Sequence, residues 1–159
     1  ELKSWWEARL HTQFEGGEWE EILENHGRRL REARLKFSYF KILHRWHWTP
    51  QKLYEAKLCT DSKCWRCDEE GGDIVHVIWK CVKLKDYWVS IKDKLTEALG
   101  NNLEFTDKLV LLHDTSDTPN LMRHQNYSQH LALQKWECFD YEHQQASPHT
   151  DSGWRKCIP

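Results

Sequence analysis

Apolar side chains recur every three or four residues over most of the first hundred positions, and this pattern predicts a mainly helical fold. Glycines, a proline and a cysteine-rich stretch separate the helical segments, which we expect at residues 2–14, 18–26, 28–46, 50–57 and 83–99. The fourth segment starts at Thr49-Pro50, because threonine is a good N-cap and proline suits the first helical position. The apolar run at residues 109–112 fits either a helix or a strand.

The periodicity also predicts where the core lies and where it ends. Most of the ten tryptophans precede Val89, so we expect the core to lie before that residue. In the third segment the apolar residues that fall near one face are Leu30, Ala33, Phe37, Phe40 and Leu43. After Asp114 the sequence becomes polar and rich in turn-forming residues. We therefore expect residues 115–159 to be largely disordered, with one marginal helix at 120–136.

Charge is distributed unevenly along the chain, although the net charge is only −2. Nine cations and two acids lie between Arg28 and Lys57, which is a local excess of seven positive charges. Such a stretch suits a polyanionic partner, but a solvated helix face explains the charges about equally well.

Membrane insertion and secretion are not expected. No apolar run reaches the roughly 18–20 residues that cross a bilayer, and acids and an arginine interrupt the amino-terminal segment ELKSWWEARL. The first residue is Glu rather than Met, so we expect a fragment or a processed product. Without an export signal the six cysteines are expected to be reduced, which favours a metal site over a disulfide framework.

The segment CWRCDEEGGDIVHVIWKC carries the clearest chemical signal. Two, eight and four residues separate its candidate ligands, which are Cys64, Cys67, His76 and Cys81. Three thiolates and one imidazole make a closed, tetrahedral structural Zn²⁺ site. Gly71-Gly72 would let the chain double back, and Asp73 would cap a short helix that carries His76 and ends near Cys81. The alternative is a chance cluster of cysteines around a core histidine.

Other cysteines and histidines are weaker candidates for metal binding. Cys59 is a competing thiol five residues before Cys64, and it could be a spare, a substitute ligand or a buried side chain. Cys138 and Cys157 are expected to be free thiols. His44 and His47 could share a metal ion across one helical turn, but a packed cluster with Trp46 and Trp48 is favoured.

Trp65 and Arg66 lie between the first two candidate ligands. An aromatic ring and a cation on a small zinc scaffold suit stacking on unpaired bases and holding phosphates. Packing of the small core of the zinc site explains Trp65 equally well, and for Trp79 packing is favoured.

The motifs HRWHWTPQKLYEAKL, CWRC, HVIWKC and KLKDYW together resemble the zinc-binding segment that follows the reverse transcriptase domain in LINE-type (non-LTR) retrotransposon proteins. The match is specific from about Phe37 to Leu99. The spacing of eight residues between Cys67 and His76 separates this motif from the retroviral knuckle, where the spacing is four. Beyond Asp114 the chain no longer resembles the family and reads more like a frameshifted or spliced end.

The resemblance implies a division of the chain and a set of ligands. It makes residues 1–58 a helical, basic connector after the polymerase thumb, 59–82 the zinc knuckle, 83–114 a C-terminal helix and cap, and 115–159 an aberrant tail. It assigns the four candidate ligands to a structural zinc ion and His44–Thr49 to a basic element that faces nucleic acid. The family protein nicks DNA and copies its RNA at the nick, and this segment is thought to help hold the template.

The expected function is therefore an accessory one. The chain lacks the Tyr-x-Asp-Asp motif of a polymerase, so we do not expect catalysis by this chain alone. We expect it to bind RNA, with DNA as an alternative, and to contact the polymerase domain of its parent protein, in the cytoplasm and nucleus. The residues expected to contact nucleic acid are Arg34, Lys41, Arg45, His47, Lys52, Trp65 and Arg66. The alternatives are a zinc-braced docking module and a non-functional relic.

Overall fold

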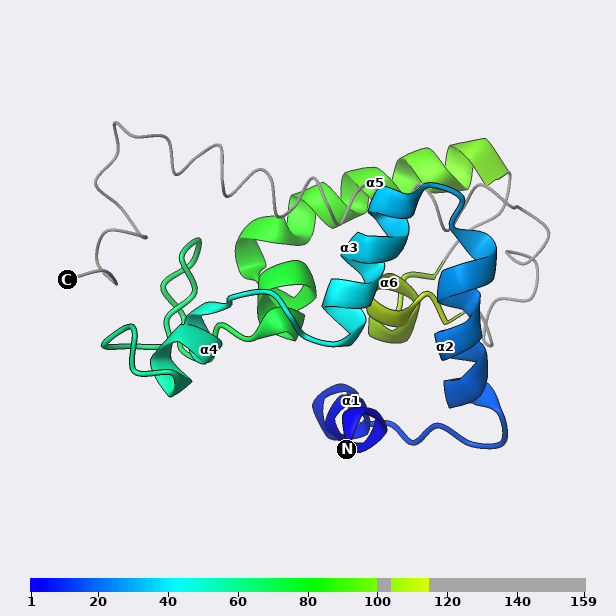
Figure 1. Cartoon of the computed structure of the whole chain (residues 1–159). Helices are drawn as coiled ribbons and strands as arrows, with labels where there is room; N and C mark the ends of the chain where they lie inside the picture. Colours follow the sequence, from blue (N-terminus) through cyan, green and yellow to red (C-terminus); the bar gives the residue numbers. More distant parts are fainter. Residues whose placement is uncertain (100–103, 115–159) are drawn as a thin grey trace.

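The structure, a computed structural model, describes residues 1–99 and 104–114, without the side chains of residues 25–29 and 98–99 (Figure 1). Within these residues the helices are α1 (Leu2–Leu10), α2 (Glu18–Arg29), α3 (Ala33–Leu43), α4 (Pro50–Glu55), α5 (Lys85–Leu99) and α6 (Asp107–Leu112). A π-helical turn, η1 (His76–Lys80), and a 3₁₀ turn, η2 (Val82–Leu84), lie between α4 and α5. The predicted mainly helical fold is confirmed. The predicted disorder of residues 115–159 and the helix at 120–136 lie outside the described residues.

Several helix boundaries differ from those predicted by the sequence. Helix α2 continues through Gly27, and the chain becomes extended only at Leu30, which has φ −92° and ψ 126°. This break buries the Leu30 side chain in the core and shortens the predicted 28–46 helix to α3. The first helix ends at Leu10 because His11 adopts a left-handed conformation with φ 51°. The run 109–112 is helical and lies in α6.

One hydrophobic cluster joins helices from both halves of the described chain. Helix α3 lies near the centre, where it packs against α2 and α6, and α6 in turn packs against η1 (Figure 1). Helix α6 buries four consecutive residues, Leu109–Leu112, and α5 adds Ile91 and Leu95. The expectation that the core lies before Val89 is therefore wrong in part, because the last helices supply much of its apolar surface.

The buried face of α3 is not the one expected from the sequence. Its buried side chains are Leu35, Ser38, Tyr39, Ile42 and Leu43, whereas Phe37 is 53% exposed. The hydroxyl of Tyr39 donates a hydrogen bond of 2.5 Å to the carbonyl of Leu112, which ties α3 to the end of α6. The Phe37–Phe40 side of the helix consequently faces away from the core.

The Trp6 side chain anchors helix α1 to the end of α3. The indole of Trp6 is fully buried, and its Nε1–H donates a hydrogen bond of 2.9 Å to the carbonyl of Leu43. The ring of Trp5 packs edge-on against Trp6, with centroids 5.1 Å apart. These contacts fix the position of α1 against a segment 37 residues away in the sequence.

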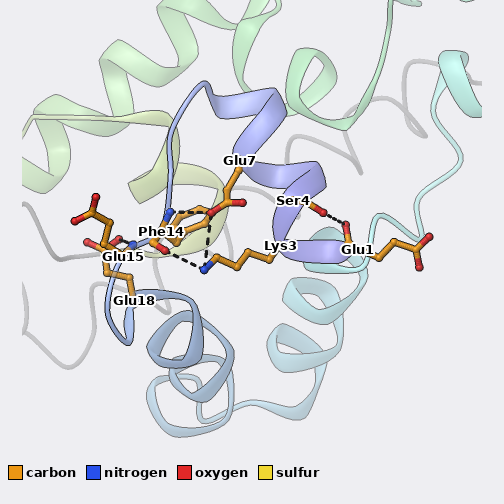
Figure 2. A network of polar contacts seen from close by, with 7 residues as sticks. All are labelled: Glu1, Lys3, Ser4, Glu7, Phe14, Glu15 and Glu18. Carbon is orange, nitrogen blue, oxygen red and sulfur yellow. Dashed lines mark hydrogen bonds and ion pairs between the residues drawn. The ribbon is translucent and has the colours of Figure 1, made fainter.

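Polar contacts hold the loop between α1 and α2 against α1, as Figure 2 shows. Glu7 accepts a hydrogen bond of 3.0 Å from the backbone N–H of Phe14, and the Lys3 ammonium donates one of 2.9 Å to the Phe14 carbonyl. The side chain of Glu18 accepts a 3.0 Å hydrogen bond from the backbone N–H of Glu15. The loop is thereby closed so that the Phe14 ring is buried beside Trp19.

Helix α4 begins as the sequence predicts. The hydroxyl of Thr49 caps the helix by accepting from the backbone N–H of Lys52, and Pro50 occupies the first turn. Just before it, α3 ends in a Schellman motif in which Trp46 donates its N–H to the Lys41 carbonyl and Arg45 takes the left-handed conformation, with φ 55°.

Among the described helices, none is long and apolar enough to span a bilayer.

Candidate metal centre

The four predicted ligands lie together in the structure. The sulfur atoms of Cys64, Cys67 and Cys81 and a ring nitrogen of His76 all lie within 4.8 Å of one another. Cys64 Sγ is 3.9 Å from Cys81 Sγ, and Cys67 Sγ is 3.2 Å from His76 Nε2. Atoms that share one tetrahedral Zn²⁺ ion stand about 3.3–3.8 Å apart, so these separations fit a single ion. Cys59 lies outside this cluster and is disulfide-bonded, so the expectation that all six cysteines are reduced is wrong for this residue.

The first two ligands converge because of a tight backbone turn. The backbone N–H of Asp68 donates a hydrogen bond of 2.9 Å to the Cys64 carbonyl, and Asp68 has a left-handed φ of 59°. The N–H of Cys64 in turn donates one of 2.8 Å to the Glu69 carbonyl. This closed loop brings the Cys64 and Cys67 side chains to the same side of the chain.

The glycine pair returns the chain toward α4, as the sequence predicts. Gly71 has a φ of 74°, which a residue with a Cβ adopts only at a cost. Gly72 donates its N–H to the Ser62 carbonyl at 2.8 Å, and a Cβ atom on Gly72 would lie 2.9 Å from the Cγ of Pro50. The close approach packs the loop of residues 64–72, which we call the metal loop, directly against the first turn of α4.

The second pair of ligands depends on the π-helical turn. His76 and Cys81 are five residues apart in the sequence. In an α-helix, two side chains at this separation would point in directions about 140° apart around the helix axis. In η1 the N–H of Cys81 instead bonds the His76 carbonyl at 2.9 Å, an i→i+5 bond that closes one turn over these five residues. The wider turn therefore places the imidazole and the thiol on one side. Nothing in the apolar pattern distinguishes it from an α-helical turn.

Asp73 caps this turn, as the sequence predicts, and links it to α1. One carboxylate oxygen, Oδ1, accepts a hydrogen bond of 2.8 Å from the backbone N–H of His76. The other, Oδ2, lies 3.0 Å from Nε of Arg9 in α1. A single aspartate thus fixes the start of the histidine-bearing turn and its position relative to the first helix.

Two further side chains satisfy carbonyl groups of η1. The Arg66 guanidinium donates a hydrogen bond of 2.6 Å to the Val77 carbonyl, and the Trp88 indole donates one of 2.8 Å to the Ile78 carbonyl. Trp79 packs edge-on against Trp88, with centroids 5.6 Å apart, and lies against the core. The turn is therefore braced from the metal loop on one side and from α5 on the other.

Burial disfavours the thiolate form of Cys64 and Cys67 when no cation is bound. It raises the pKa of the Cys64 thiol to about 12 and also raises the pKa of Cys67. A metal ion must displace these protons to gain thiolate ligands, so its binding releases protons and weakens as the pH falls. Three soft sulfur donors and one imidazole match the preference of Zn²⁺ and leave no tetrahedral position for a catalytic water.

Two substitutions of Asp73 distinguish its role as the cap of η1 from its ion pair with Arg9. We expect Asp73→Ala to lower metal affinity by about fivefold, since loss of an N-cap costs about 1 kcal/mol. Asp73→Asn keeps an oxygen for the cap but loses the charge that faces Arg9. Its affinity should stay within about twofold, because an ion pair with a half-exposed arginine contributes little. Competition with a chromophoric chelator measures both. Equal weakening by the two variants would mean that the ion pair, not the cap, positions His76.

The residues expected to contact nucleic acid also make contacts within the protein. The Arg45 guanidinium lies 4.4 Å from the centroid of the Trp5 ring, and the Lys52 ammonium donates to the Arg45 carbonyl. Burial and the Arg45 charge lower the pKa of Lys52. Arg34 pairs with Glu32 at 4.0 Å, and Arg66 braces η1.

The remaining three expected contact residues have different exposures. Lys41 is partly exposed, and its ammonium lies 4.4 Å from the centroid of the Phe37 ring. His47 and Trp65 are half-buried. The aromatic cluster expected around the two histidines forms only in part. Trp46 packs edge-on against Phe40, but it is 58% exposed.

Sequence reasoning missed an exposed row of aromatic side chains on α3. The pattern had assigned Phe37 and Phe40 to the apolar face, yet Phe37 is exposed and Phe40 only half-buried. The signal that could have found them is the alternative helical series Leu35, Tyr39 and Ile42, which supplies the buried face without either phenylalanine.

No protein-family model matches the sequence, and no solved structure matches the chain. The class of site is therefore defined by its own geometry, as a cluster of three cysteines and one histidine that could hold a metal ion, in a mainly helical fold.

Proposed function

We propose that this chain is a nucleic-acid-binding accessory module, with RNA as its ligand, of a LINE-type retrotransposon reverse transcriptase. The observation that carries the proposal is the exposure of aromatic side chains within a strongly basic stretch. Phe37, Trp46, Trp48 and Tyr54 are each about half exposed or more. Such side chains are costly to leave in water without a partner, and they suit stacking on unpaired bases.

The charge of the same stretch supports a polyanionic ligand. From Ala33 to Leu43, helix α3 carries three cations, Arg34, Lys36 and Lys41, and no acid. Cations on one surface release counterions from a phosphate backbone, which drives binding and makes it depend on salt. Arg45 and Lys52 contribute charge to this region even though their side chains contact the protein.

In this proposal the metal ion is Zn²⁺ and its role is structural. The metal loop packs on α4 through Gly72 and Pro50, and the Gln51 N–H donates to the Gly72 carbonyl at 3.2 Å. Helix α4 follows the His44–Thr49 segment directly, so the metal loop helps to hold the basic, aromatic stretch in place. The chain would act beside the polymerase domain of its parent protein, in the cytoplasm and the nucleus.

A second candidate function is a zinc-braced docking module for that polymerase domain. Three exposed aliphatic residues favour it, namely Leu58, Val82 and Val89, each about half exposed. They lie outside residues 28–57 in the sequence. Aggregation or dimerisation in size-exclusion chromatography, with no RNA binding, would favour docking.

The test of the proposed function is fluorescence anisotropy of labelled single-stranded RNA with the zinc-loaded chain. We expect a micromolar or tighter dissociation constant that weakens as salt rises. Three neutralised phosphates would give a log–log slope of about −2 for the association constant. Undetectable binding by folded, zinc-containing protein would reject the function for this chain.

A further inference from the structure

The outer side of α3 carries a row of rings that we call the α3 aromatic stripe: Phe37, Phe40, His44 and Trp46. Phe37, Phe40 and His44 follow one another at spacings of three and four residues, which places them on one side of the helix. The rings of Phe40 and His44 have centroids 4.1 Å apart, and those of Phe40 and Trp46 are 5.1 Å apart at right angles. Both ends of the stripe are exposed, Phe37 at 53% and Trp46 at 58%.

The stripe lies beside positive charge. The Lys41 ammonium lies 4.4 Å from the centroid of the Phe37 ring, in cation–π contact with it. No acid occurs between Ala33 and Trp48, and Glu32 at the start of α3 is paired with Arg34. A phosphate next to a base stacked on Phe37 would therefore lie within reach of the Lys41 ammonium.

The charge around the stripe favours nucleic acid over a protein partner. Exposed aromatic side chains occur at protein interfaces as well as on base-stacking surfaces, so the rings alone do not distinguish the two partners. The cations beside the stripe, with no acid from Ala33 to Trp48, match the phosphates of a nucleic acid. From Phe37 to His44 the helix rises about 10 Å, which spans two to three nucleotides of a stacked strand.

We infer that the α3 aromatic stripe is the surface on which unpaired bases of a single strand stack, with Lys41 bound to an adjacent phosphate. The inference rests on the proposed function and goes further by naming the site and the form of the ligand. It also moves the base contacts away from the metal loop, where Arg66 donates to the Val77 carbonyl and braces η1. Stacking reads no base edge, so single-stranded DNA should bind by the same contacts as RNA.

The test compares variants of the full, zinc-loaded chain in anisotropy titrations with a labelled single-stranded oligouridine RNA. We expect Phe37→Ala and Trp46→Ala each to weaken binding by about tenfold, as loss of one stacked base does, without changing the salt slope. Lys41→Gln should lower the slope by about 0.7, the contribution of one phosphate on a single strand. The matched controls are Val89→Ala, an exposed apolar residue of α5, and Lys94→Gln, an exposed cation of α5. Both should bind like the parent chain.

The outcomes distinguish failure of the α3 aromatic stripe as the binding site from failure of RNA binding itself. If the parent chain binds RNA but Phe37→Ala and Trp46→Ala bind equally well, the stripe is not the site, while RNA binding stands. Equal competition by duplex RNA would also overturn the inference, because paired bases cannot stack on the stripe. Absence of binding by the folded parent chain rejects the proposed function itself. Unchanged melting temperatures of the two variants would exclude unfolding as the cause of weaker binding.

Discussion

Removal of the metal ion with a chelator is expected to unfold the described domain, with loss of helical circular dichroism and of a cooperative thermal transition. Structural zinc contributes about 10–16 kcal/mol in small zinc domains, whereas a whole domain is stable by only about 5–15 kcal/mol. The site is continuous with the core, since Cys64, Cys81 and Ile78 are buried in the main hydrophobic cluster. Loss of the ion would remove the bonds that join Cys64 and Cys67 to His76 and Cys81.

The effect of the chelator is also expected to depend on pH. The raised pKa values of Cys64 and Cys67 mean that protons compete with the metal ion throughout the neutral range. Metal affinity should fall as the pH is lowered, and lower chelator concentrations should then unfold the protein. Cys64→Ser and Cys81→Ser should behave like the chelated protein, and Cys59→Ser should retain the metal. An unchanged thermal transition in excess chelator would contradict a stabilising role for the ion.

Replacement of Trp6 by alanine should destabilise the zinc-loaded protein by about 4–6 kcal/mol. Loss of a fully buried tryptophan costs about 3–5 kcal/mol through the cavity, and the Leu43 carbonyl loses a hydrogen bond that contributes about 1 kcal/mol. This approaches the whole stability of a typical domain, so much of the population would unfold. Denaturant titration measures the change.

The matched control for Trp6→Ala is Trp48→Ala, because Trp48 is 55% exposed. Its substitution should change stability by no more than about 0.5 kcal/mol, as is usual for surface positions. A loss of less than about 1 kcal/mol in Trp6→Ala would mean that α1 is not an integral part of the fold.

The sequence predicts the local features of the candidate site well. The spacing of the cysteines and the histidine identifies all four members of the cluster. Asp73 and Thr49 are recognised as caps because their side chains act on backbone groups only three residues away. Features of this kind depend on short-range geometry, which a sequence pattern records directly.

The structure adds what depends on distant contacts or on backbone choices that side chains do not reveal. The π-helical hydrogen bond between His76 and Cys81 cannot be recognised from the apolar pattern, although it places these two side chains on one side of the turn. The face of α3 was assigned wrongly because two apolar series run along it, and only packing against α6 selects the one that contains Tyr39. The hydrogen bond from Trp6 to Leu43 joins residues too far apart for periodicity to relate them.

The proposed metal site can be tested most directly by X-ray absorption at the zinc edge of the zinc-loaded chain. The expected first shell holds three sulfur atoms at about 2.3 Å and one nitrogen atom at about 2.0–2.1 Å. This result would establish Cys64, Cys67, His76 and Cys81 as a closed structural site. Four sulfur neighbours would instead place a further cysteine in the site in place of His76, and an oxygen neighbour would indicate an open site. Either result would contradict the proposed ligand set.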